Sequence, residues 1–374
     1  MQFAVKKSDL SDPVGWVARS LPTRPPMQVL LAMKIETLDG MVSFSAFDYE
    51  QSALCKVAAE PGSKDGVVFV PGRLLSDIVK ALPQDVVTVE VEGNRAVLRA
   101  GSARFTVPMI PGEDYPELPA LPSNIGTVDP VELAKAISQV AIAAGKDSTL
   151  PVLTGVRVEI DPEAATLTFV ATDRYRLAVR TISFTPVAGP QAMQVLIPAK
   201  SLTDFAKAMG NDEPVRLGVE NGGGGSAAGF SVSNGQRTAT ARLLDGEFPK
   251  YAALLPSSHN GRAVVSISDL SEAVKRAGLV AHKNAPCRLT FSDGGVQVQG
   301  GTGDEAMADE RVACDYEGEE MSIAFNIQYL LEGLAAVEGL EVVVSLTSGS
   351  RPATLTPVDG DGRFTYLIMP VRQA

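Results

Sequence analysis

The stretch VVFVPGRLLSDIVKALP (67–83) has a form that recurs twice further along the chain. A short apolar run rich in β-branched residues meets a one-residue break, and the residues after it carry Leu, Ile and Val at helical spacing. The same form returns in QVLIPAKSLTDFAKAMG (194–210) and in SIAFNIQYLLEGLAAVEG (322–339). The breaks are Pro71, Pro198 and Asn326, which lie 127 and 128 residues apart. This regular spacing predicts three copies of one structural unit.

Other elements recur in the same phase. A helix with Asp or Ser–Asp at its start is expected to open each copy, over 8–22, 129–146 and 268–283. A pair of alternating strands follows each time, and further strands follow the helix after the break. The turns between the paired strands are Asp39–Gly40, Asp161–Pro162 and Asp293–Gly294. Each copy thus reads helix, strands, helix, strands, which predicts an α+β fold built from antiparallel sheets.

The length of 374 residues favours two or three domains. Proline-rich and polar stretches at 116–124 and 256–262 are suitable linkers between the copies. The predicted domains are 1–122, 123–256 and 257–374.

The sequence lacks the patterns of common active sites. It has two histidines, His259 and His282, and no Gly-x-Ser-x-Gly elbow. The glycine-rich segment 220–229 lacks the Gly-Lys-Ser/Thr of a phosphate loop and is read as a hairpin tip, and GTGDEA (301–306) lacks the last glycine of a dinucleotide fingerprint. DGDGR (359–363) is read as a hairpin turn and not as a calcium loop. We expect no catalytic residues, no metal site and no cofactor.

The cysteines and the hydropathy pattern point to the cytoplasm. The three cysteines are odd in number and widely spaced, which favours reduced thiols over a disulfide framework. No apolar run is long enough for a membrane span, and no signal peptide is recognisable.

Charge is unevenly distributed along the chain. The net charge is −11, but the six expected helical segments carry thirteen basic and eight acidic side chains, a net +5. These segments are 5–24, 72–83, 130–146, 199–209, 268–283 and 326–337. Basic helices in an acidic protein would suit a ring whose helices surround DNA. The alternative is that Lys and Arg simply favour helix surfaces, and charge alone does not separate the two.

Four further stretches carry a resemblance to a known family. They are MQFAVKKSDL (1–10), TDRYRLAV (172–179), DGEFPKY (245–251) and YLIMPVR (366–372). Together with the threefold repeat, which covers essentially the whole chain, they resemble the bacterial β sliding clamp, the β subunit of DNA polymerase III, and most of all its actinobacterial members.

The resemblance implies a function that involves no catalysis by the chain itself. The family forms head-to-tail homodimeric rings of six similar domains, with helices inside and sheets outside, that encircle duplex DNA in the nucleoid and act as processivity factors. The implied partners are double-stranded DNA, a second copy of the chain, the DNA polymerase III α subunit, the clamp loader, other clamp-binding proteins and, for some members, a cyclic-peptide inhibitor. A replication-unrelated scaffold that reuses the ring is a competing interpretation, and an enzyme would need a nucleophile–base pair that the sequence does not show.

The resemblance also implies a pocket for short, mainly apolar peptides. Its residues by family position are Leu153, Thr172, Arg174, Tyr175, Arg176, Leu177, Pro249, Leu254, Leu367, Met369, Pro370, Val371 and Arg372. Leu, Val, Pro and Met would form an adaptable apolar floor. Arg176 and Arg372 are expected to bind carbonyls or carboxylates of the peptide at the rim. Burial in an ordinary core is the alternative for Leu153, Leu177 and Met369.

Cations near the helices are the expected DNA contacts. Arg24, Lys146 and Lys283 match positions that touch DNA in the family, and the other helix cations are expected to support them. These others are Arg73, Lys200, Lys275 and Arg276.

The chain departs from the family pattern at three places. Many members have Gly-His where this chain has Arg174–Tyr175, the stretch 24–34 is bulkier than usual, and the chain ends Gln373–Ala374. A specialised second clamp with a remodelled pocket that confers resistance to a clamp-binding antibiotic is therefore an alternative to the general replication clamp.

Overall fold

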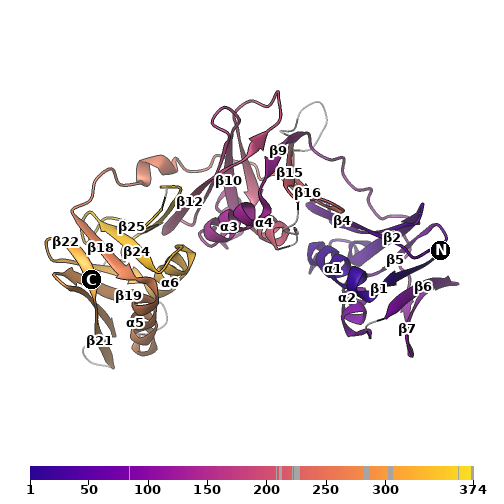
Figure 1. Ribbon diagram of the computed structural model, residues 1–374, viewed down its shortest axis with the longest axis horizontal. Coiled ribbons are helices and arrows are strands. Elements are labelled where there is room, and N and C mark those ends of the chain that lie inside the picture. Colours follow the sequence, from indigo (N-terminus) through magenta and orange to yellow (C-terminus); the bar gives the residue numbers. More distant parts are fainter. Residues whose placement is uncertain are drawn as a thin grey trace. The chain divides into compact units, whose positions relative to one another are not determined.

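The computed structural model describes residues 1–83, 85–207, 209, 213–220, 222, 228–281, 286–301, 306–360 and 362–371. It is α+β, as expected, with antiparallel sheets and α-helices (Figure 1). The chain forms two compact units. The first, unit 1, comprises Met1–Val131, Phe184–Pro190 and Lys200–Leu243. The second, unit 2, comprises Glu132–Ser183, Gln191–Ala199 and Leu244–Ala374.

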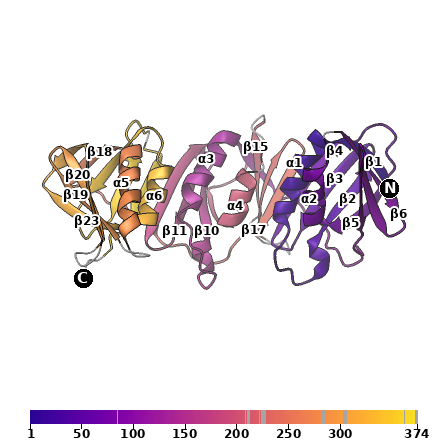
Figure 2. The ribbon, with the colours of Figure 1, turned by 90° about the horizontal axis from the view of Figure 1, so that it is seen from below.

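Unit 1 contains a four-stranded and a nine-stranded sheet. The small sheet has the order β1 (Gln2–Lys6), β6 (Val86–Glu92), β7 (Arg95–Ala100), β8 (Ala103–Pro108). The large sheet has the order β13 (Thr185–Pro186), β9 (Asn124–Val128), β15 (Val215–Glu220), β16 (Gly229–Asn234), β17 (Arg237–Arg242), β4 (Gln51–Ala58), β3 (Met41–Phe47), β2 (Ala32–Leu38), β5 (Gly66–Pro71). The helices of this unit are α1 (Lys7–Val17), α2 (Gly72–Ala81) and α4 (Ala199–Ala206, whose first residue falls in unit 2). Helices α1 and α2 pack side by side (Figure 2).

Unit 2 repeats this plan. Its small sheet has the order β21 (Met307–Val312), β20 (Gly295–Gly301), β19 (Pro286–Ser292), β23 (Met321–Asn326). Its large sheet has the order β14 (Met193–Pro198), β10 (Gly155–Asp161), β11 (Thr166–Thr172), β12 (Arg176–Ser183), β26 (Phe364–Ile368), β25 (Ala353–Pro357), β24 (Glu341–Leu346), β18 (Gly261–Ser266), β22 (Cys314–Gly318). Its helices are α3 (Pro130–Ala141, which starts in unit 1), α5 (Ile267–Val280) and α6 (Ile327–Ala336), and α5 packs beside α6 (Figure 2).

Each large sheet joins two sequence copies. In unit 1, β17 of the second copy pairs with β4 of the first, and the hydroxyls of Ser52 and Thr240 lie 2.7 Å apart across this seam. In unit 2, β12 of the second copy pairs with β26 of the third, from Arg176 opposite Ile368 to Arg180 opposite Phe364. The middle copy is therefore shared between the two units.

The predicted strand–helix breaks are confirmed at all three positions. Strands β5, β14 and β23 end at Pro71, Pro198 and Asn326, and α2, α4 and α6 begin at the next residue. Asn326 caps its helix, since its side-chain oxygen accepts a hydrogen bond of 3.1 Å from the backbone N–H of Tyr329. The apolar residues buried beneath the helices include Leu75 and Val79 in α2 and Leu330 and Leu334 in α6.

The prediction for the start of each copy missed one strand. A strand precedes the opening helix every time: β1 before α1, β9 before α3 and β18 before α5. The opening helices are also shorter than expected, ending at Val17, Ala141 and Val280. After Val17 the chain makes only a short 3₁₀ turn (Ala18–Ser20) before Pro22 and Pro25, which lack the N–H that a continuing helix needs.

These helix ends correct the predicted charge of the helices. The six α-helices carry seven basic and eight acidic side chains, so their net charge is −1 and not +5. The cations that fall outside are Lys6 in β1, Arg19, Arg24, Lys146 and Lys207; Lys283 lies outside the described residues. Among the described cations of this group, Arg19 and Lys207 directly follow helix ends, where the helix dipole favours positive charge, and Arg24 and Lys146 lie farther along the chain.

In the part of the chain that the structure describes, no helix is long and apolar enough to cross a membrane.

Two helical glycines provide a test of the packing in unit 2. A Cβ on Gly333 in α6 would lie 2.4 Å from the ring of Tyr366, whereas one on Gly278 in α5 would meet only ordinary contacts of 3.6 Å or more. We expect Gly333→Ala to lower the free energy of unfolding by about 1–3 kcal/mol through overpacking. Gly278→Ala should raise it by up to about 1 kcal/mol, because Ala is the better helix former. Denaturant unfolding of both variants measures the difference, and equal effects would contradict the close approach of α6 to Tyr366.

Candidate functional site

The hairpin Thr172–Arg176 between β11 and β12 is closed by its own hydrogen bonds. The Thr172 hydroxyl donates to the carbonyl of Arg176 at 2.7 Å and accepts from the N–H of Arg174 at 3.2 Å. The carboxylate of Asp173 accepts from the N–H groups of Tyr175 and Arg176 at 3.0 and 3.1 Å. Arg174 has a φ of 78°, in the left-handed region that favours glycine. These bonds hold the hairpin in one conformation.

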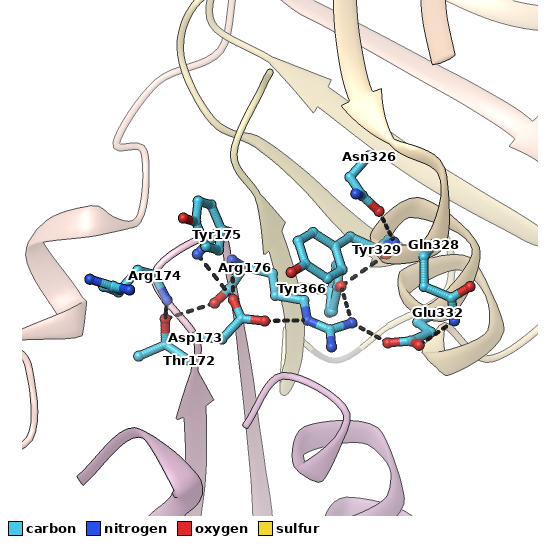
Figure 3. A network of polar contacts seen from close by, with 10 residues as sticks. All are labelled: Thr172, Asp173, Arg174, Tyr175, Arg176, Asn326, Gln328, Tyr329, Glu332 and Tyr366. Carbon is cyan, nitrogen blue, oxygen red and sulfur yellow. Dashed lines mark hydrogen bonds and ion pairs between the residues drawn. The ribbon is translucent and has the colours of Figure 1, made fainter. Parts of the chain in front are cut away.

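A buried guanidinium ties this hairpin to α6 and β26 (Figure 3). The side chain of Arg176 is only 4% exposed. It donates to Asp173 at 3.0 Å, to Glu332 of α6, and to the hydroxyl of Tyr366 in β26 at 3.4 Å. It also lies over the ring of Tyr329, with its carbon 4.4 Å from the ring centre. Tyr366 in turn donates to the carbonyl of Tyr329 at 2.9 Å.

The pKa shifts in this network show that the ion pair outweighs the effect of burial. Burial alone would raise the pKa of Glu332, but hydrogen bonds from Arg176 and Gln328 lower it overall. Burial would likewise lower the pKa of Arg176, yet Tyr366 and Glu332 raise it. The pKa of the fully buried Tyr366 hydroxyl is raised by desolvation, which keeps this group a neutral donor.

Beside this network lies a pocket formed by the end of the chain. Met369 donates its N–H to the carbonyl of Tyr175 at 2.8 Å, and Val371 donates to Ala324 at 2.8 Å. The pocket has a volume of about 450 Å³ and is lined by Ser322, Ile323, Ala324, Gly349, Ser350, Met369, Pro370 and Val371. Tyr175 stands next to this tail, and its ring faces that of Tyr329 with centres 6.3 Å apart and planes 26° from parallel.

An apolar cluster lies beneath the hairpin. Its buried members are Val170, Leu177, Leu196, Phe248 and Leu367, and its half-buried members are Val152, Val179, Leu244, Tyr251 and Leu255. The segment 244–255 is held against β10 by Arg157, whose guanidinium carbon lies 6.0 Å from the ring centre of Phe248 and 5.8 Å from that of Tyr251. Half-buried apolar side chains over a buried floor form a surface that a short apolar segment can cover.

The structure brings most of the expected pocket residues into unit 2 with different degrees of burial. Thr172, Arg176, Leu177 and Leu367 are buried, and Leu153 and Pro370 are half-buried. The exposed residues are Arg174, Tyr175, Pro249, Leu254, Met369 and Val371. Arg372 lies outside the described residues.

The expected role of Arg176 at the rim was wrong. Its guanidinium is only 4% exposed and is enclosed by Asp173, Glu332 and two tyrosines, with Nε and Nη1 donating within the chain, so it does not stand at an open rim. Sequence reasoning also missed Tyr329 and Glu332 as partners. Their three-residue spacing, one helical turn in α6, was the available signal.

Several of the cations expected to bind DNA are paired with acidic side chains. Lys200 lies 2.7 Å from Asp204, Lys275 lies 2.8 Å from Glu272, and Arg276 contacts Glu310 at 2.6 Å. Arg73 donates to the carbonyl of Leu21. Arg24 and Lys146 lie beyond helix ends, and Lys283 is outside the described residues.

Among the described residues, no group of three or more His, Cys, Asp or Glu side chains is placed to hold a metal ion.

Family models match nearly the whole chain, in the order of the three sequence copies. The N-terminal domain of the DNA polymerase III β subunit matches residues 1–119, the central domain 127–250 and the C-terminal domain 252–372. The chain belongs to the DNA polymerase III β subunit family.

Relatives of this β subunit support the same assignment along its full length. It is 44% identical to the β sliding clamp of Streptomyces coelicolor, over all of this chain and 99% of that protein. It is 36% identical to the β sliding clamp homolog GriR of Streptomyces muensis, with the same coverage. The crystal structure of the Pseudomonas aeruginosa sliding clamp bound to griselimycin matches with a TM-score of 0.90 at 27% identity, over 100% of both chains.

Removing the buried cation tests the network of Arg176. Arg176→Met should lower the free energy of unfolding by about 2–4 kcal/mol, because two largely buried carboxylates lose their partner; Glu332 is a quarter exposed, which keeps the value below that of a fully buried pair. Arg99→Met is the matched control, since Arg99 also bridges two carboxylates but at an exposed site. Urea unfolding of both variants gives the comparison, and equal losses would refute the special role of the buried pair.

The lowered pKa of Glu332 predicts a loss of stability in acid. The folded protein lowers the pKa of Glu332 below its ordinary value of 4.5, so the charged carboxylate stabilises the fold at any pH above 4.5. This stabilisation is lost as the pH falls from 4.5 through the lowered pKa of the folded state. The free energy of unfolding should therefore fall more steeply below pH 4.5 in the wild type than in Glu332→Gln. Urea unfolding between pH 3 and pH 7 checks this, and parallel curves would show that Glu332 is not involved.

Proposed function

We propose that this β subunit works as a head-to-tail homodimeric ring that encircles duplex DNA in the nucleoid and tethers the replicative polymerase, with no chemistry of its own. The observation that carries the proposal is the match of three successive clamp domains over the whole chain. A ring holds DNA by topology, so loose phosphate contacts without base-specific readout suffice and permit sliding. Tethering raises the local concentration of the polymerase at the primer end.

Two sheet edges support the dimer. The four described sheets end in eight strands that pair on one side only, and β8 in unit 1 and β21 in unit 2 are two of them. An open edge invites another strand, and a second copy of the chain can cover it. Apolar side chains are exposed nearby: Phe105 on β8, Met307 on β21 and Leu279, 83% exposed, at the end of α5. We propose that β8 of one subunit meets β21 of the next.

The charges of the two edges are complementary. Strand β8 carries Arg104, which pairs with Glu92, and β21 carries Asp309, Glu310 and Arg311, a net charge of −1, with Glu310 paired to Arg276. Opposite charges favour the head-to-tail arrangement and oppose a contact between two copies of the same edge.

The DNA contacts proposed are Arg24, Arg73, Lys146, Lys200, Lys275, Arg276 and Lys283. Lys200, Lys275 and Arg276 are the weaker candidates, since each is paired with a carboxylate and a paired cation neutralises less phosphate charge. Arg24 and Lys146 are the stronger candidates, because no ion pair is found for either in the described part of the chain.

We assign partner binding to the apolar cluster and the neighbouring tail pocket of unit 2. A short, mainly apolar segment of the polymerase α subunit, the clamp loader or another clamp-binding protein fits this surface. A Pseudomonas aeruginosa relative binds griselimycin, which supports a cyclic-peptide inhibitor as a further ligand. The domain limits 1–122, 123–256 and 257–374 remain our proposal for the three clamp domains.

A specialised clamp with a remodelled pocket is the second candidate. The relationship to GriR and the Arg174–Tyr175 pair favour it. The higher identity to the Streptomyces coelicolor clamp, 44% against 36%, favours the general clamp.

Retention on circular DNA tests the ring directly. The wild type, loaded by a clamp-loader ATPase, should stay on nicked circular DNA and leave it after linearisation. Leu279→Asp should migrate as a monomer and fail to be retained, because it places a charge in the proposed interface, while Leu340→Asp, equally exposed, should have no effect. Gel filtration and a bead-based retention assay give the results, and equal retention of the wild type on circular and linear DNA would contradict the ring.

The proposed DNA cations predict a salt-dependent defect. Arg24→Ala combined with Lys146→Ala should weaken binding to DNA and make the logarithm of the binding constant depend less steeply on salt, by about 1–2 units of slope. Lys200→Ala with Lys275→Ala removes the same charge from ion-paired sites and should weaken binding less. Fluorescence anisotropy with duplex DNA at several salt concentrations measures both slopes.

A further inference from the structure

Arg174 has an uncommon backbone conformation and a guanidinium that is bonded to no described side chain. Its φ of 78° lies where residues other than glycine are uncommon. Its backbone N–H bonds to Thr172, but no hydrogen bond or ion pair joins its guanidinium to another side chain in the described part of the chain. The side chain is exposed and points away from the network of Arg176 (Figure 3). Asp39, Tyr49 and Ala165 also have a positive φ, so it is the exposed guanidinium, unpaired among the described residues, and not the backbone alone that singles out Arg174.

The hairpin fixes the backbone from which the side chain of Arg174 extends. Thr172 and Asp173 close the turn with hydrogen bonds on both sides of Arg174, and Arg176 anchors its end in the interior. The backbone of Arg174 is thus held in place before any ligand arrives, and its side chain reaches only the surface around the hairpin. A preorganised backbone reduces the entropy lost on binding, while the side chain itself is ordered by its ligand.

Asp147 does not bond to the cation. Its carboxylate accepts from the N–H and hydroxyl of Thr149, at 2.9 and 2.7 Å, and these bonds lower its pKa more than the charge of Arg174 does. Asp147 lies in the segment whose Gly145 N–H bonds to the carbonyl of Leu153 at 2.7 Å. Arg174 therefore borders the segment that carries Leu153 and stands on the hairpin above the apolar cluster.

We infer that Arg174 makes this clamp select peptides that carry an acidic residue beside their apolar anchors. A guanidinium and a carboxylate form paired, charge-assisted hydrogen bonds, for which the five donors of Arg are well suited. The apolar cluster binds the hydrophobic residues of the peptide, and Arg174 reads its charge. This inference rests on the proposed peptide site of unit 2.

A matched set of peptides tests the selection. Acetylated hexapeptides with Leu and Phe anchors are compared, in which Asp or Asn is placed in turn at each remaining position. In the wild type, one Asp peptide should bind about two- to fivefold more tightly than its Asn partner, as expected for an exposed ion pair, and the ratio should fall with salt. Arg174→Ala and Arg174→Gly should bring the ratio to one. Arg174→Glu should reverse it and favour a Lys peptide at the same position.

Controls separate charge reading from other effects. Arg262→Ala removes an exposed cation of β18 and should keep the wild-type ratio. Arg174→Gly should be at least as stable as Arg174→Ala in thermal unfolding, because glycine adopts a φ of 78° without strain. Equal affinity of all Asp and Asn peptides for the wild type would overturn the inference and leave the peptide site standing. Failure of every peptide to bind would overturn both, and an effect of Arg174→Ala on DNA retention alone would assign the cation to DNA.

Discussion

The buried guanidinium of Arg176 is the interaction on which the candidate site of unit 2 depends. A cation that is almost fully enclosed is stable only when carboxylates and hydrogen-bond acceptors surround it. Here those partners come from three places: Asp173 from the hairpin, Glu332 from α6, and Tyr366 from β26. One side chain thus fixes a turn of the second sequence copy against a helix and a strand of the third.

The same seam explains why the pocket stands where it does. Strand β12 pairs with β26, and the last strand carries the chain on to Met369 and Val371, which bond to Tyr175 and Ala324. The tail pocket and the apolar cluster are consequently neighbours of the hairpin. A ligand that covers both can contact residues from two copies without moving either.

The sequence predicted those structural features that are encoded in neighbouring residues. The repeat at Pro71, Pro198 and Asn326 predicted the strand–helix junctions, because a break followed by helical periodicity is encoded in adjacent residues. The opening strands β1, β9 and β18 were missed, since each is short and is followed by a helix after at most one residue. The positive charge expected on the helices fell mostly beyond their ends, where local composition is a poor guide to the boundary.

The sequence by itself determined the threefold repeat, the α+β class and the family, and it pointed to the residues around TDRYRLAV as the candidate site. Only the tertiary structure decided what those residues do. Arg176 and Arg174 are two positions apart and chemically identical, yet Arg176 is enclosed by Glu332 and Tyr366, and Arg174 is exposed in a left-handed turn. Two partners of Arg176, Glu332 and Tyr366, lie more than 150 residues away in the chain, so no local pattern could tell the enclosed arginine from the exposed one.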